Sequence, residues 1–339
     1  MINKKEPNTC PHKTSIGGQA VMEGVMMRGP KKIATAVRKP DGEIIIDEQE
    51  LGKVRKGKFV KLPIIRGCVN FIDSMIIGVK ALMFSAQFYD VDEDGNPTPQ
   101  EPSKFEAWLE KKLDSDKATN IVIYISVVLS LLLSIAIFMW LPATLTGLLR
   151  NIIPSDGVLT TIEGTLRILI FILYLFFVSR MNDIKRVFMY HGAEHKSIFC
   201  YEKGLELTVD NVREQSRLHP RCGTSFLLIV MIISIIIYRF IPWDQDTLTS
   251  LPIIGKVAEF SDELVRIVLR LLLLPLVAGI SYEIIKFAGR HDNVFTRAIS
   301  KPGMWFQKIT TNEPDDAQIE VAIAAIKAVI PDNKEDDKW

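Results

Sequence analysis

One stretch of the chain, Ile121 to Leu141, runs for 21 residues without a single charge. At 1.5 Å per residue, a helix of this length spans the roughly 30 Å hydrocarbon core of a bilayer. The alternative is a buried helix of a soluble protein, but such helices usually carry a polar stripe. The stretch therefore predicts a transmembrane helix.

Three further apolar blocks follow, each with a few charges. They are Leu159 to Ser179, Gly223 to Ile241 and Leu264 to Ile285. Their arginines can reach an interface along aliphatic stems, and Glu163 and Glu283 lie toward the ends of their blocks. We therefore expect a mainly α integral membrane protein with about four transmembrane helices, which form a membrane domain over residues 119–285.

The connections between these blocks differ in their content of Lys and Arg. Residues 180–222, between the second and third blocks, hold eight of them, whereas residues 142–158 hold only Arg150. Basic residues tend to stay on the cytoplasmic side of membrane helices. We expect a multi-pass cell-membrane protein with both termini and the central segment 180–222 in the cytoplasm, and with the lipid bilayer as its first partner.

The overall composition excludes two classes of protein. The 339 residues include 41 Lys plus Arg and 40 Asp plus Glu, and 48% of them are hydrophobic. A disordered chain has far fewer apolar residues, and a nucleic-acid-binding protein has an excess of basic residues that contact phosphates. No nucleic acid is expected as a partner, whereas other membrane proteins are.

The region before the first block, residues 15–90, predicts a small cytoplasmic β element and an amphipathic helix. Ile33 to Lys39 alternates as a strand, Pro40-Asp41-Gly42 is typical of a turn, and Glu43 to Asp47 predicts the returning strand. From Ile65 to Met83, apolar residues recur at spacings of three and four, which indicates a helix. Whether this helix, within residues 64–89, is interfacial or spans the membrane stays open.

The remaining segments are shorter. Residues 91–118 are expected to be a linker, and residues 286–330 a cytoplasmic C-terminal segment. Glu313-Pro314-Asp315-Asp316 predicts the start of a helix that ends before Pro331, because acids favour a helix N-terminus. The charged tail, residues 331–339, is expected to be disordered.

Three of the five histidines lie between positions 191 and 219. His191-Gly192-Ala193-Glu194-His195 has the H-x-x-E-H order of inverzincin metallopeptidases. On a helix the two imidazoles share a face and can hold a divalent metal such as Zn²⁺, and Glu194 can act as a general base. His219, Glu202, Glu214 and Cys222 are candidates for a third ligand.

An alternative needs no metal. His191 and His195 are then polar residues at the end of a transmembrane helix, and Gly192 weakens the helix that would hold them.

The four cysteines, Cys10, Cys68, Cys200 and Cys222, form no C-x-x-C pair and are expected to be reduced thiols on the cytoplasmic side.

A second unusual segment, Gly17 to Pro30, contains four glycines, which allow tight turns and close approach of the backbone to a partner or ligand. It lacks the Gly-Lys-Ser/Thr ending of a P-loop. Glu23 and Arg28 within it are candidate site residues, with an ordinary salt bridge as the alternative.

Three segments carry a family resemblance: Gly17 to Pro30, Tyr190 to Lys196 and His219 to Phe226. They resemble the signature motifs of the DUF1385 family, and Lys301-Pro302-Gly303 and Glu313-Pro314-Asp315 fit as well. The resemblance covers roughly Ser15 to Ile330. It implies a multi-pass bacterial membrane protein and a predicted metal-dependent enzyme without an established reaction.

Three functions follow from these observations. The first is a metal-dependent membrane hydrolase with Glu194 as base and with His191, His195 and either His219 or Glu202 as ligands. The second is a non-catalytic scaffold or membrane-protein biogenesis factor, in which His191, Glu194, His195 and Arg221 form a buried polar network. The third, a transporter, has the weakest basis because the spans show no internal repeat.

Overall fold

The computed structural model describes residues 12–51, 62–88, 125–126, 128–241, 262–291 and 293–338. The chain forms two compact units. One comprises Met1–Pro97, Leu175–Val230 and Ala278–Trp339, and the other Thr98–Tyr174 and Met231–Val277. The expected linker and the acidic connection after the third apolar block lie outside the described residues.

The first unit contains a four-stranded antiparallel sheet in the order β1-β2-β3-β4, with β1 Gly17–Val21, β2 Gly24–Arg28, β3 Lys32–Arg38 and β4 Ile44–Glu50. The predicted hairpin is confirmed as β3 and β4, with Gly42 in the turn at φ 90°. The glycine-rich segment forms a second hairpin that the sequence did not predict. Its turn contains Glu23 at φ 47°, which is unusual for a residue with a side chain.

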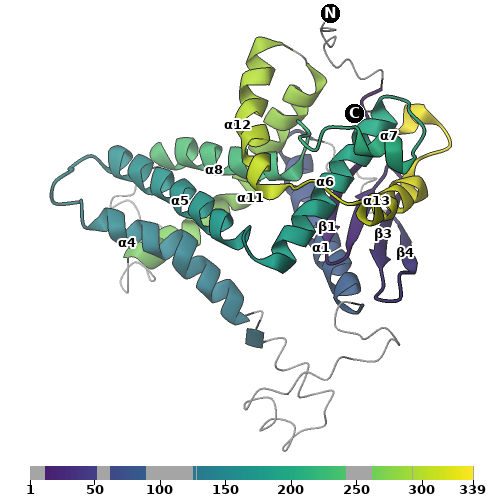
Figure 1. Ribbon diagram of the computed structural model, residues 1–339. Coiled ribbons are helices and arrows are strands. Elements are labelled where there is room, and N and C mark those ends of the chain that lie inside the picture. The colour runs from purple at the N-terminus through teal and green to yellow at the C-terminus, as the bar shows by residue number, and fades with distance from the viewer. Residues whose placement is uncertain are drawn as a thin grey trace, which may run out of the picture. The chain divides into compact units, whose positions relative to one another are not determined.

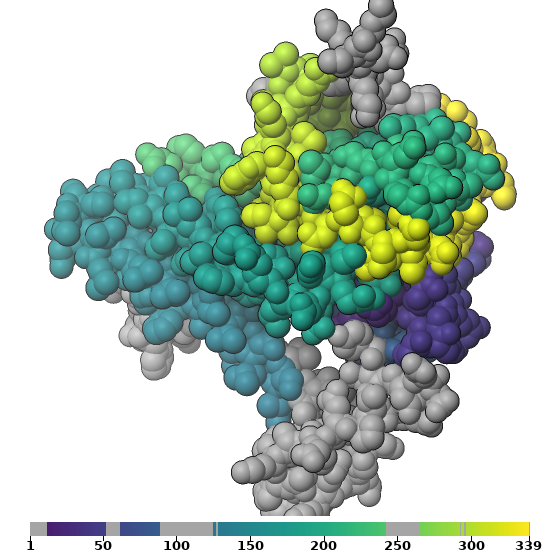
Figure 2. All heavy atoms as spheres, viewed as in Figure 1, coloured from purple at the N-terminus to yellow at the C-terminus, as the bar shows by residue number. Residues whose placement is uncertain are grey.

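Helices cover both faces of this sheet (Figure 1). α6 (Asn182–Glu202) and α13 (Asp316–Val329) pack on one face, where Val25, Met27 and Ala36 join their buried side chains. α1 (Ile65–Ala86) covers the other face through Ala81. In Figure 2 the yellow atoms of α13 lie between the teal atoms of α6 and α7 and the purple strands. Successive residues of β2 thus contribute to opposite cores, as strand geometry requires.

The central segment 180–222 was expected to be a loop, but most of it is helical. α6 takes up 21 residues, and α7 (Val209–Arg213) follows it. Nearly every residue from Tyr190 to Glu202 is buried between the sheet and α13. Packing on several sides therefore outweighs the helix-weakening effect of Gly192. The glycine is itself needed, since a Cβ there would lie 2.1 Å from the carbonyl oxygen of Asn312.

The C-terminal region contains the predicted helix and one that was missed. α13 begins at a capping box formed by Asp315 and Gln318, which confirms the expected start. α12 (Val294–Thr310) precedes it and contains Pro302 in its interior. The expectation of a disordered tail is wrong for residues 331–338. Residues Lys334–Asp337 form a short 3-10 helix, and Asp337 is fully buried.

Apolar helices make up much of the rest of the chain. Four helices among the described residues are long and apolar enough to cross a membrane: Ile65–Ala86, Val128–Gly147, Asp156–Val178 and Val265–Arg290. They include the predicted amphipathic helix α1, and three of them match predicted blocks. The remaining predicted block, Gly223 to Ile241, corresponds to α8 (Gly223–Arg239), which is shorter at 17 residues.

Buried charges in the second unit pair with one another. The carboxylate of Glu163, on α5 (Asp156–Val178), accepts hydrogen bonds from both terminal nitrogens of Arg270, on α11 (Asp262–Arg290), the longer at 2.7 Å. Arg167 adds a third contact at 2.8 Å. A buried charged side chain is stable only when it is paired with an opposite charge. The ion pairs therefore stabilise the contact between α5 and α11.

Gly192→Ala is expected to destabilise the protein even though alanine favours helices, because the new Cβ would collide with the Asn312 carbonyl. We expect a loss of about 1–3 kcal/mol, seen as a lower thermal midpoint of the detergent-purified protein. Gly147→Ala is the matched control, since open space surrounds that helical glycine. An unchanged midpoint for Gly192→Ala would contradict the packing described.

Asp337→Ala is expected to cost about 1–3 kcal/mol, because the buried Thr14 hydroxyl, 2.5 Å from Oδ2, would lose its acceptor. His12 Nε2 would lose its partner at 2.7 Å as well. Thermal unfolding measures the effect. Asp336→Ala, which removes only an exposed contact with Lys31, should leave the midpoint nearly unchanged. Equal midpoints for the two variants would contradict the burial of Asp337 and favour a disordered tail.

Candidate metal centre

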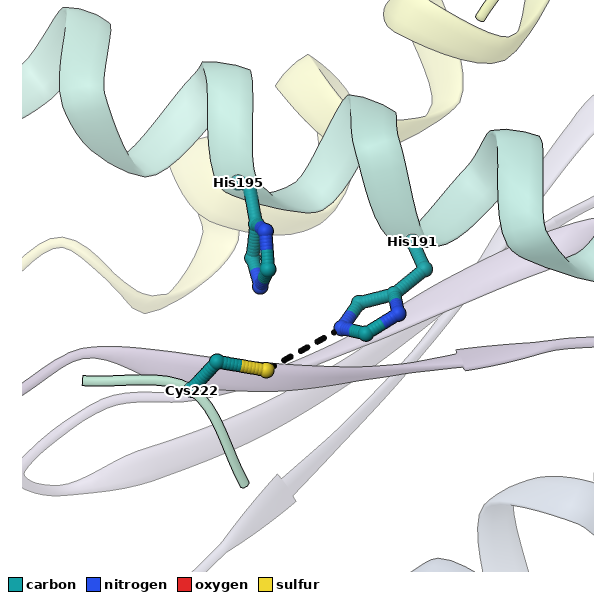
Figure 3. Close-up of side chains that lie close together, drawn as sticks. All are labelled: His191, His195 and Cys222. Carbon is teal, nitrogen blue, oxygen red and sulfur yellow. Dashed lines mark hydrogen bonds between the residues drawn. The ribbon is translucent and has the colours of Figure 1, made fainter. Parts of the chain in front are cut away.

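The two histidines of the H-x-x-E-H motif lie one helical turn apart on α6, and their rings project toward Cys222, the residue before α8 (Figure 3). His191 Nε2 is 3.2 Å from the Cys222 sulfur. One ligand atom from each of the three residues lies within 4.8 Å of the other two, and all three residues are buried. Among the described residues, this is the group whose donors could hold one metal ion.

Backbone carbonyls orient both imidazoles. His191 Nδ1 is 2.9 Å from the carbonyl oxygen of Thr310, and His195 Nδ1 is 2.5 Å from that of Arg217. Each Nδ1 therefore donates its proton to the backbone, which leaves Nε2 as the available ligand nitrogen in the neutral ring. Histidine ligands in metalloproteins are commonly held in this way.

The buried polar atoms fit a metal. Nε2 of His195 is buried and has no hydrogen-bond partner within normal distance in the part of the chain that the structure describes. Leaving such an atom unsatisfied costs about 1–3 kcal/mol unless a ligand occupies the site. Two imidazole nitrogens and one thiolate are donors that Zn²⁺ prefers, and catalytic zinc sites have three protein ligands and one open position.

The electrostatics favour the ligand form of the cysteine. Burial by itself would raise the pKa of the Cys222 thiol, but the neighbouring His195 and His191 hold that pKa well below its usual range. Burial likewise acts to lower the pKa of His191, yet the Cys222 thiolate raises it to about 9. Both shifts favour a thiolate at Cys222 beside a protonated His191, and the thiolate is the form that binds metals.

Glu194 lies beside these donors. The backbone amide of Gly18 donates a hydrogen bond to its carboxylate, and a Cβ on Gly18 would come within 2.9 Å of Glu194 Cγ. Its Oε2 is buried, lies 3.9 Å from His191 Nε2, and has no hydrogen-bond partner among the described residues. Burial raises the pKa of Glu194, as expected for a carboxyl that exchanges a proton. The first hairpin therefore needs glycine at position 18 to reach the motif.

Two of the other predicted ligands, His219 and Glu202, form a neighbouring cluster, whereas Glu214 is exposed outside it. His219 Nε2 faces Glu202 Oε2 at 3.4 Å, and Arg221 also pairs with the Glu202 carboxylate. Glu202 Oε1 accepts the backbone N–H of Thr14 at 2.9 Å. Burial acts to raise the pKa of Glu202, but His219 and Arg221 lower it below its usual value. Glu202 is thus already engaged, and Cys222 supplies the third donor close to His191 and His195.

Glu23 and Arg28 each form a salt bridge, with partners other than each other. Glu23 receives two hydrogen bonds from Arg186, at 2.5 and 2.6 Å, and one from the Tyr190 hydroxyl at 3.1 Å. These contacts attach the turn of the first hairpin to α6, one turn before the motif. Arg28 lies 3.9 Å from Asp73 and donates to Ser74 at 3.2 Å.

A cavity of about 770 Å³ opens onto the candidate metal centre. His191, Glu194, His195 and Cys222 line one part of it, and residues of the first hairpin, α1 and the end of α11 line much of the rest. Its volume is within the range of small-molecule sites. Sequence reasoning missed the carbonyls of Thr310 and Arg217, and it also missed Lys286 and Arg290 in the cavity. No local pattern marks them, because folding alone brings them there.

Comparison with known proteins places the chain in a family. The family described as "Protein of unknown function (DUF1385)" matches residues 62–332. The chain is 35% identical over 322 residues to "Uncharacterized protein YqhQ" of Bacillus subtilis (strain 168), covering 93% of this chain and 92% of that protein. No solved structure matches. The chain belongs to the DUF1385 family.

Proposed function

We propose that the protein is a metal-dependent hydrolase in which His191, His195 and Cys222 hold a divalent ion and Glu194 is the general base. The observation that carries the proposal is the convergence of these groups on one cavity: a thiolate, two oriented imidazoles and a buried carboxylate oxygen without a hydrogen-bond partner among the described residues. The cavity is large enough for a substrate to reach them.

The role of each residue follows from its position. A bound divalent ion supplies a Lewis acid that polarises an electrophilic group of the substrate. Glu194, fixed by the Gly18 amide, presents Oε2 to remove a proton from the attacking water and to return it to the leaving group. Thr310 and Arg217 hold the imidazoles through their carbonyls.

The apolar helices support a second part of the proposal, a multi-pass membrane protein with both termini on one side. The sheet, α6 and α13 share one hydrophobic core and therefore lie on the same side of a membrane. An even number of crossings must then separate β4 from α6, and again α6 from α13. α8 and α11 supply one pair, and Val128–Gly147 and α5 the other.

α1 is then the apolar helix that does not cross. It contacts the sheet through Ala81, with Ile77 and Phe84 packed beside it, so it lies along the membrane surface or enters it only in part. This arrangement keeps four crossings, and the basic residues of 180–222 assign the shared side to the cytoplasm. The candidate metal centre would thus face the cytoplasm next to the bilayer.

Metal analysis tests the ligand set. Protein purified without a histidine tag is expected to contain about one Zn²⁺ or other divalent ion per chain by elemental mass spectrometry. His191→Ala, His195→Ala and Cys222→Ala should each reduce this to background, whereas His219→Ala should retain the metal. His291→Ala and Cys200→Ala are matched controls outside the cluster. Metal-free wild-type protein, even after supplementation, would refute the proposed centre.

Glu194→Gln tests the base. The amide keeps the shape of the side chain but cannot accept the proton, so we expect normal metal content and accumulation with activity lowered about 10²- to 10⁴-fold. Complementation of a deletion strain measures the activity before the substrate is known. Full complementation by Glu194→Gln at normal expression would instead favour the non-catalytic scaffold.

A further inference from the structure

The charges that line the cavity are unbalanced. Its described lining contains one carboxylate, Glu194, and five basic side chains: Arg28, Arg221, Lys286, Arg290 and Lys338. Three of the five already have a carboxylate partner. Arg28 faces Asp73, Arg221 faces Glu202, and Lys338 contacts Glu335 at 2.5 Å. The remaining two, Lys286 and Arg290, account for the excess positive charge of the lining.

Lys286 and Arg290 lie four residues apart at the end of α11, on one face of the helix. No carboxylate lies within salt-bridge distance of either one among the residues that the structure describes. Glu283, the nearest acid along the helix, is paired with Arg66 on α1. Two like charges at this spacing repel each other, and the helix C-terminus offsets that repulsion only in part. An anion in the cavity would compensate them.

The same cavity has an apolar side. Met26 of β2, Ile77 of α1 and Phe188 of α6 line it. α1 and the end of α11 are held closely together, because Gly67 and Gly279 meet where any Cβ would collide. The two cations thus share a cavity with apolar side chains of β2, α1 and α6.

We propose that the cavity binds a phosphate-bearing lipid, with the phosphate on Lys286 and Arg290 and the hydrocarbon chain against the apolar part of the lining. Arg and Lys are the side chains that bind phosphate oxygens most strongly. A free phosphate compound would use the two cations but not the apolar face. This inference names the substrate class of the proposed hydrolase. Hydrolysis of the bound lipid rests on that proposed function, whereas binding of the lipid does not.

The test measures binding by the full-length, detergent-purified protein. The probes are dihexanoyl phosphatidic acid, the corresponding neutral diacylglycerol and inorganic phosphate, followed by native mass spectrometry or calorimetry. We expect saturable binding of phosphatidic acid alone. Lys286→Gln/Arg290→Gln should weaken it about tenfold or more, because two charge-assisted hydrogen bonds are lost. Lys286→Arg/Arg290→Lys should retain binding, which separates charge from folding effects.

Lys301→Gln/Lys308→Gln is the matched control, since both lysines are exposed on α12 and lie outside the cavity. Equal affinity of wild type and the Lys286/Arg290 Gln variant would overturn the proposal. Binding of inorganic phosphate with similar affinity would overturn its lipid part. Cys222→Ala separates this inference from the metal centre, since it is expected to lose the metal and to keep lipid binding. If wild-type protein contains no metal but still binds phosphatidic acid, the lipid site stands and the proposed hydrolase fails.

Discussion

The structure depends on the close burial of one face of α6 against the glycine-rich hairpin and the segment after α12. Gly18 and Gly192 permit that approach, because a side chain at either position would collide with Glu194 or with the Asn312 carbonyl. The approach places the Thr310 carbonyl on His191 and the Gly18 amide on Glu194. Packing and the orientation of the candidate donors are therefore consequences of the same contacts.

The buried charged and polar groups of the two units differ in their hydrogen-bond partners. In the apolar unit, the carboxylate of Glu163 accepts hydrogen bonds from Arg270 and Arg167. Around the candidate metal centre, Glu202 is satisfied by Arg221 and His219, whereas His195 Nε2 and Glu194 Oε2 have no hydrogen-bond partner among the described residues. Unsatisfied buried groups are costly, so they persist where a ligand compensates them.

Local patterns predicted the elements whose signals are contained within a few residues. The β3–β4 hairpin has its turn residues, α13 its acidic start, and α1 its apolar spacing. The β1–β2 hairpin, α12 and the ordered tail were missed. Glycine disfavours strands, Pro302 disfavours a helix interior, and a charged tail has no apolar face, so packing against distant residues decides each of them.

The sequence by itself determined that the chain is rich in membrane-length apolar helices and that His191, Glu194 and His195 share a helical face, since both facts depend on spacing along the chain. It left the third donor open between His219, Glu202, Glu214 and Cys222. The tertiary structure brings Cys222 to the two histidines, while Arg221 and His219 engage Glu202. Spacing cannot show which side chains already have partners, because those partners are brought in by folding.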